Sequence, residues 1–99
     1  MTRGVVIRRV VVADDDLLVR AGVVAVLATL EGIEVVAEAA SLPELEAAVA
    51  ETSPDVVVTD IRMPPTLTDE GVRAARWLRS LEPPVGVVVL SQHAEPDFV

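Results

Sequence analysis

The sequence contains no cysteine and no lysine, and Trp77 and Phe98 are its only aromatic residues of the Phe, Trp and Tyr types. The lack of cysteine excludes a disulfide framework and a thiolate metal site. No apolar run reaches the roughly 20 residues that a membrane-spanning helix needs. Residues 1–4 are too short for the charged region of a signal peptide. These absences predict a cytoplasmic protein that does not enter a membrane.

The charge of the chain is strongly negative. Its 16 acidic residues outnumber its 8 arginines, which gives a formal net charge of −8. Because nucleic acid presents a dense line of phosphates, we expect no direct nucleic-acid binding by this chain. The 99 residues suffice for one domain, and the 52% hydrophobic content suffices for a core.

Apolar runs alternate with amphipathic stretches along the chain. The apolar runs predict strands at residues 5–13, 33–40, 55–59 and 85–90. The stretches between them predict helices at residues 17–30, 41–53 and 72–81, and residues 94–99 fit the start of a fourth. Strands that are apolar throughout and separated by helices predict a parallel sheet covered on both faces. Right-handed crossovers make this a doubly wound α/β fold.

Two of the predicted helices carry more specific signals. Ser41 and Glu44 fit a capping box, in which the Ser41 hydroxyl caps a backbone N–H and Glu44 reaches back to the Ser41 N–H. In the third helix, the apolar positions are Val72, Ala75, Leu78 and Leu81.

Acidic and hydroxyl side chains follow the predicted strands at their carboxyl ends. Asp14, Asp15 and Asp16 follow the first strand, Asp60 follows the third and Ser91 the fourth. Ligands of doubly wound sheets bind beyond these strand ends, where residues far apart in sequence converge. Carboxylates packed together repel one another, and a bound cation relieves that repulsion. Mg²⁺ is the natural candidate, because it takes oxygen ligands and commonly uses one or two carboxylates.

An ionised aspartate beside Mg²⁺ can act as a nucleophile and form an aspartyl-phosphate. A hydroxyl at Ser91 fits a hydrogen bond to a phosphoryl oxygen. Each residue also has a simpler explanation, since an Asp at the start of a helix is often only its N-cap. Ser91 equally fits the cap of a following helix. The combination of sites at neighbouring strand ends favours the chemical interpretation over these separate ones.

Three segments resemble a known family. Residues 10–15 (VVVADD), 55–64 (DVVVTDIRMP) and 88–91 (VVLS) are similar to the strands and acidic site of bacterial response-regulator receiver domains. The stretch 14–22 (DDDLLVRAG) most resembles receivers of the NarL/LuxR type, which precede a helix-turn-helix DNA-binding domain. The resemblance covers nearly the whole chain.

This resemblance implies a flavodoxin-like (βα)5 fold and a role in two-component signal transduction. It implies that Asp60 accepts a phosphoryl group from a sensor histidine kinase and so controls a DNA-binding output domain absent from this chain. It also implies that Asp14, Asp15 and Asp60 bind Mg²⁺ together with the backbone carbonyl of Arg62. Ser91 would contact the phosphoryl group as the switch hydroxyl, with at most self-phosphorylation and autodephosphorylation as catalysis.

The chain departs from the family in its last third. The family has a Lys at the end of a fifth strand, whereas this sequence has no Lys and ends where a fourth helix would begin. Residues 1–99 are thus expected to form an incomplete receiver domain with strand order 2-1-3-4, lacking the fifth strand and helix. Either truncation or degeneration explains this, and the abrupt end of the match favours truncation. Strand 85–90 would then be an apolar edge, which predicts self-association.

Two other functions are compatible with parts of the sequence. Asp14-x-Asp16 after an apolar strand loosely matches the nucleophile motif of haloacid-dehalogenase-type phosphatases, which would make Asp14 the nucleophile. The missing Lys fits a receiver-like dimerisation or binding module that works without phosphorylation, although the retained acidic positions count against it.

Overall fold

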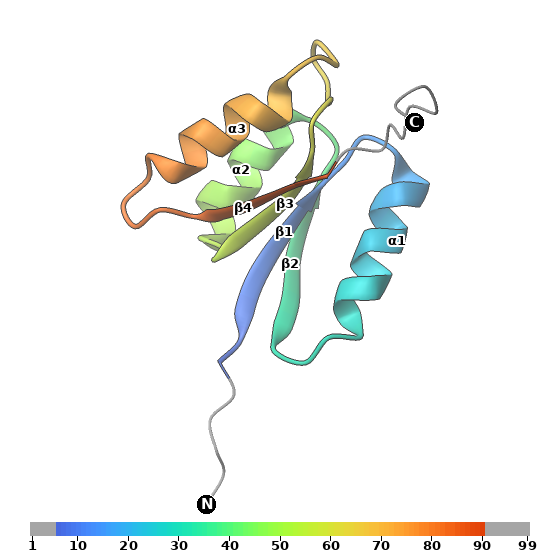
Figure 1. Cartoon of the computed structure of the whole chain (residues 1–99), viewed down its shortest axis with the longest axis vertical. Helices are drawn as coiled ribbons and strands as arrows, with labels where there is room; N and C mark the ends of the chain where they lie inside the picture. The colour runs from blue at the N-terminus through green and yellow to red at the C-terminus, as the bar shows by residue number, and fades with distance from the viewer. Residues whose placement is uncertain (1–5, 91–99) are drawn as a thin grey trace, which may run out of the picture.

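A computed structural model describes residues 6–90 of the chain, with strands and helices in strict alternation (Figure 1). The elements in chain order are β1 (Arg8–Ala13), α1 (Leu17–Ala28), β2 (Ile33–Ala39), α2 (Leu42–Thr52), β3 (Val56–Asp60), α3 (Glu70–Arg79) and β4 (Gly86–Leu90). Each matches a predicted element, with ends that differ by a few residues. Ser91 and the predicted fourth helix lie outside the described residues.

The strands form one parallel sheet in the order β2-β1-β3-β4. This confirms the predicted doubly wound α/β arrangement and its strand order. In the central pair, Ala13 of β1 lies opposite Thr59 of β3. The next residues, Asp14 and Asp60, therefore lie side by side at the carboxyl edge of the sheet.

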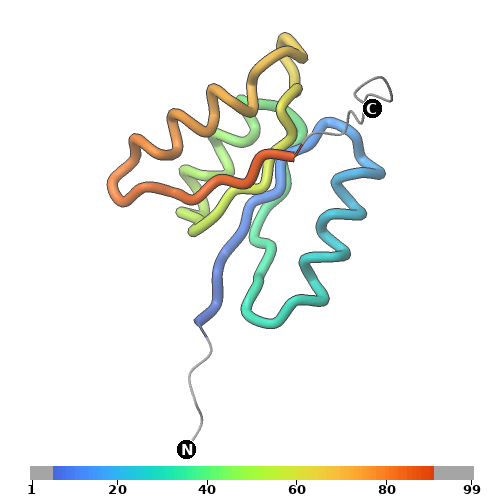
Figure 2. The backbone as a smooth tube through the Cα atoms, in the orientation of Figure 1, coloured from blue at the N-terminus to red at the C-terminus, as the bar shows by residue number. Residues whose placement is uncertain are grey.

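Helices cover the sheet on both faces. Helix α1 lies on one side, and α2 and α3 lie together on the other (Figures 1 and 2). Successive strand residues point to opposite faces, so Val11 packs into the core beneath α2 and α3 while Val10 and Val12 pack beneath α1. The larger core, under α2 and α3, includes Val11, Val57, Leu45, Val49, Met63, Ala74 and Leu78.

The predicted capping box is present at the start of α2, but one of its two hydrogen bonds has a different partner. The Ser41 hydroxyl accepts a hydrogen bond from the Glu44 N–H at 3.2 Å, as predicted. The Glu44 carboxylate reaches back to the N–H of Ala40 at 2.9 Å rather than to that of Ser41. The helix ends where Ser53 adopts a left-handed conformation with φ 47°.

The buried face of α3 overlaps only in part with the apolar positions 72, 75, 78 and 81. Glu70, Gly71, Ala74 and Leu78 are buried, whereas Val72 is 40% exposed. The reason is that the first turn of α3 packs closely on the end of β3. The Gly71 N–H donates to the Ile61 carbonyl at 2.8 Å, and this contact turns the helix away from the purely apolar stripe.

Strand β4 pairs on one side only within residues 6–90. Its last three residues, Val88, Val89 and Leu90, are all partly exposed. Val88 and Leu90 border an apolar groove that β3 and β4 form with α1, lined in part by Val26 and Leu27. Among the described residues, no helix is long and apolar enough to cross a membrane.

The packing of α2 on the sheet gives a first prediction. Leu45 is completely buried, so Leu45→Ala should lower the free energy of unfolding by about 2–5 kcal/mol through lost burial and a residual cavity. Urea denaturation followed by circular dichroism measures this change. Leu18→Ala is the control, because Leu18 is 83% exposed. An equal effect of both substitutions would contradict the described core.

Candidate functional site

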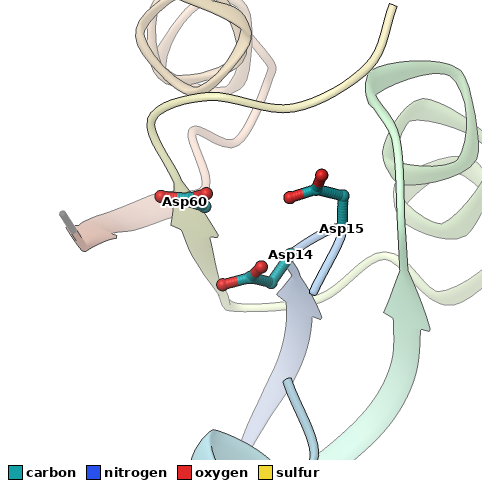
Figure 3. A group of neighbouring side chains, drawn as sticks. All are labelled: Asp14, Asp15 and Asp60. Carbon is teal, nitrogen blue, oxygen red and sulfur yellow. The ribbon is translucent and has the colours of Figure 1, made fainter. Parts of the chain in front are cut away.

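Three aspartates converge at the carboxyl edge of the sheet. Figure 3 shows Asp14 and Asp15 at the end of β1 and Asp60 at the end of β3, all facing one small region. One carboxylate oxygen from each lies within 4.8 Å of the others. Asp14 and Asp60 are buried, whereas Asp15 is exposed. The structure thus brings together the three acidic residues that the sequence selected.

The loop between β1 and α1 fixes the first of these carboxylates. The Asp14 N–H donates to the Ala39 carbonyl at 2.9 Å, and one Asp14 carboxylate oxygen accepts the Asp16 N–H at 2.8 Å. Asp16 itself caps α1, because its side chain accepts the N–H groups of the helix's first turn. One of the three consecutive aspartates is therefore a helix cap, which is the alternative that the sequence left open.

Arg20 braces the same loop, and the sequence analysis missed it. Its guanidinium donates to the Asp14 backbone carbonyl at 2.7 Å and pairs with the Glu38 carboxylate at 3.0 Å. Glu38 lies near the end of β2, so the pair ties β1, α1 and β2 together beside the acidic cluster. An Arg one turn into a helix after an acidic pair is the only sequence signal for this role, and it is a weak one.

The backbone around Asp60 is held from several directions. The Thr59 hydroxyl donates to the Asp60 carbonyl at 3.0 Å, and the Ile61 N–H donates to an Asp60 carboxylate oxygen at 2.9 Å. Gly71 packs so closely that a Cβ there would lie 2.1 Å from the Asp60 carbonyl oxygen. Only glycine allows α3 to begin this near to the acceptor segment.

The electrostatics of the cluster disfavour three negative charges. Burial raises the pKa of the Asp60 carboxyl above its ordinary value, and the nearby Asp14 and Asp15 carboxylates raise it further. Hydrogen bonds from the Ile61 and Arg62 N–H groups act in the opposite direction, but the pKa stays raised. A positive ion between the carboxylates would relieve the repulsion.

The donor set fits a small hard cation. All three side chains offer oxygen, which Mg²⁺ prefers, and opposite ligands of an octahedral Mg²⁺ are about 4 Å apart. The three carboxylate oxygens, within 4.8 Å of one another, span a similar distance. Of the other predicted site residues, Arg62 follows directly after Ile61 with an exposed side chain, and Ser91 lies outside the described residues.

The comparison with known proteins decides the family. Residues 10–99 match the response regulator receiver domain family. The chain belongs to this family. It is 37% identical over 90 residues to the response regulator GacA of Pseudomonas aeruginosa. It is 38% identical over 91 residues to the probable transcriptional regulatory protein NarL of Mycobacterium tuberculosis.

The solved structures agree with this family and with the fold. The signal receiver domain of the M. tuberculosis NarL superposes with a TM-score of 0.78 at 38% identity, covering 95% of this chain and 73% of that one. The sequence match with GacA covers 91% of this receiver chain and 41% of GacA. The chain therefore spans less than half of the curated relatives. The match gives no support to the phosphatase alternative, and the Asp16 side chain is occupied as a helix cap.

Glu70 is a second residue that the sequence analysis missed. It is completely buried at the start of α3. Burial by itself opposes ionisation of the carboxyl, but hydrogen bonds from Thr66 and Thr68 outweigh it and lower its pKa to about 2. The T-x-T-x-E spacing is the only signal in the sequence, and it is too short to be specific.

The raised pKa of Asp60 predicts a pH dependence of stability. The folded receiver binds this proton more tightly than the unfolded chain does, so stability falls as pH rises from about 4, the ordinary aspartate pKa, through the raised folded value. In EDTA, Asp60→Asn should therefore unfold at higher urea concentration than wild type at pH 7. The difference should shrink as the pH approaches 4.

Urea titrations between pH 4 and pH 8 measure this difference. Glu46→Gln on the exposed face of α2 removes the same charge away from the cluster, so it controls for the general effect of net charge. A gain in Asp60→Asn no larger than in Glu46→Gln, or one independent of pH, would contradict the raised pKa of Asp60.

Proposed function

We propose that this receiver domain accepts a phosphoryl group on Asp60, with Mg²⁺ held by Asp14, Asp15, Asp60 and the backbone carbonyl of Arg62. The observation that carries the proposal is the convergence of the three carboxylates in a chain of the receiver family. Asp60 is the acceptor in this assignment because it ends β3 within the segment 55–64, whereas Asp14 and Asp15 follow β1.

The chemistry at Asp60 is a displacement at phosphorus. One carboxylate oxygen forms a bond to the phosphorus atom, and the bond from phosphorus to the donor's imidazole nitrogen or acyl oxygen breaks. The donor leaves with the electron pair of that bond. A bound Mg²⁺ would supply charge neutralisation for the phosphoryl oxygens. The Ile61 and Arg62 N–H groups already hydrogen-bond the Asp60 carboxylate, and they hold it in place for the attack.

The phosphoryl donor in this proposal is the phosphohistidine of a sensor histidine kinase. The relatives are named as response regulators and transcriptional regulatory proteins, which supports control of transcription by the longer protein. In this proposal that control is exerted through a DNA-binding output domain. Ser91, the residue after β4 in the sequence, would contact the phosphoryl group as the switch hydroxyl in this proposal. Because the sequence has no Lys, the usual lysine contact to that group is not available from these residues.

Beryllofluoride binding tests the acceptor. Wild type should bind beryllofluoride in the presence of Mg²⁺ and become heavier by one phosphoryl group with an acyl phosphate, whereas Asp60→Asn should do neither. Fluorine NMR and intact mass measure the two reactions. Asp69→Asn, an exposed aspartate at the start of α3, is the matched control and should react like wild type.

Phosphorylation of Asp60→Asn to the same extent as wild type would place the acceptor elsewhere. No reaction of folded wild type that still binds Mg²⁺ would favour the alternative, a receiver-like binding module that does not use phosphorylation.

We also propose that this 99-residue chain self-associates through β4. The support is the one-sided pairing of β4 within the described sheet and the exposure of Val88, Val89 and Leu90. Light scattering should give a mass above that of the monomer at high concentration, and Val88→Lys should reduce it because a charge on the edge opposes pairing. Val72→Lys on α3, which is similarly exposed, is the control. A monomer at every concentration would refute the proposal.

A further inference from the structure

Glu70 is the one completely buried charged side chain among residues 6–90. Its carboxylate accepts three hydrogen bonds from the preceding loop. One oxygen accepts the Thr66 N–H at 2.6 Å and the Thr66 hydroxyl at 2.5 Å, and the other accepts the Thr68 N–H at 3.1 Å. Charge-assisted bonds of this kind are about twice as strong as neutral ones. The position at the N-terminus of α3 also favours a negative charge.

The loop that these bonds hold is exposed and conformationally unusual. Thr66, Leu67 and Thr68 are all exposed, and Leu67 has a left-handed backbone with φ 59°. Such a conformation is costly for a side chain other than glycine, so surrounding contacts must hold it. The Glu70 carboxylate provides them on both sides of Leu67. Inside the loop, the Leu67 N–H donates to the Met63 carbonyl at 2.8 Å.

The same helix turn touches the acceptor segment. Gly71, next to Glu70, donates its N–H to the Ile61 carbonyl at 2.8 Å. The Cα of Gly71 lies so near the Asp60 carbonyl that no side chain fits between them. Any movement of this turn is therefore transmitted directly to the backbone of residues 60–62, from which the acceptor carboxylate and the Arg62 carbonyl project.

We propose that Glu70 is a positioning residue for the acceptor site, tying the 66–68 loop to the first turn of α3 and thereby fixing the backbone of residues 60–62 for metal binding. It acts through Gly71 and does not touch the carboxylate cluster itself. The identity of the metal rests on the proposed function, but the link from Glu70 to residues 60–62 does not.

Three variants separate this role from simple stabilisation. Glu70→Gln keeps the size of the side chain but replaces one carboxylate oxygen by an NH2 group. This group cannot accept the hydrogen bonds that the replaced oxygen accepts. Thr66→Val removes the hydroxyl's bonds to Glu70 and to the Thr68 hydroxyl, and it keeps the shape and the Thr66 N–H bond. Thr66→Ser keeps the hydroxyl and is the conservative control.

The readout is a Mg²⁺ titration followed by amide NMR shifts, with hydrogen exchange of the Gly71 amide measured on the same metal-free samples. Glu70→Gln should raise the half-saturating Mg²⁺ concentration by about ten-fold, the usual scale for residues that support metal ligands. It should also speed exchange at Gly71 and shift the amides of Ile61 and Arg62. Thr66→Val should change the Mg²⁺ midpoint, the Gly71 exchange rate and the amide shifts in the same direction to a smaller extent. Thr66→Ser should match wild type.

The outcomes decide between a positioning and a purely structural role. A lower melting temperature in Glu70→Gln with unchanged Mg²⁺ midpoint and unchanged shifts at residues 60–62 would overturn the proposal. If Glu70→Gln does not fold, Thr66→Val decides by the same criteria. If wild type binds no Mg²⁺, the proposed function fails. The metal-free amide shifts and the Gly71 exchange then support or overturn the positioning role alone.

Discussion

The parallel pairing of β1 with β3 is the constraint on which the site depends. Because Ala13 lies opposite Thr59, the next residue of each strand is an aspartate at the same sheet edge. This register brings carboxylates from distant parts of the chain within 4.8 Å of one another. Burial raises the pKa of Asp60 there, and repulsion from the neighbouring Asp14 and Asp15 carboxylates raises it further. The close arrangement of carboxylates that suits a bound cation therefore also disfavours full ionisation of these carboxylates when no metal is bound.

Hydrogen bonds from three segments hold the backbone around the cluster. Arg20 binds the carbonyl of Asp14, Thr59 binds the carbonyl of Asp60, and Gly71 binds the carbonyl of Ile61. These bonds fix the positions of the acidic residues through their backbone.

Much of the fold follows from local pattern. The valine-rich segments 10–13 and 56–58 are apolar on both sides, which requires helices on both faces. Each element predicted within residues 6–90 is present. The resemblance to receiver domains implied the order of the strands, and the acidic positions after β1 and β3 were predictable from residue type. The buried face of α3 was not, because the contact of Gly71 with Ile61, rather than the apolar spacing, sets the rotation of that helix.

The sequence by itself determined the alternation of strands and helices, the acidic residues at the strand ends and the resemblance to receiver domains, since these depend on residue type and spacing. Only the tertiary structure decided which of the three consecutive aspartates caps a helix. It alone placed Arg20 beside Asp14 and buried Glu70 under an exposed loop. Those roles arise from hydrogen bonds between segments, and such bonds produce no periodic pattern in the sequence.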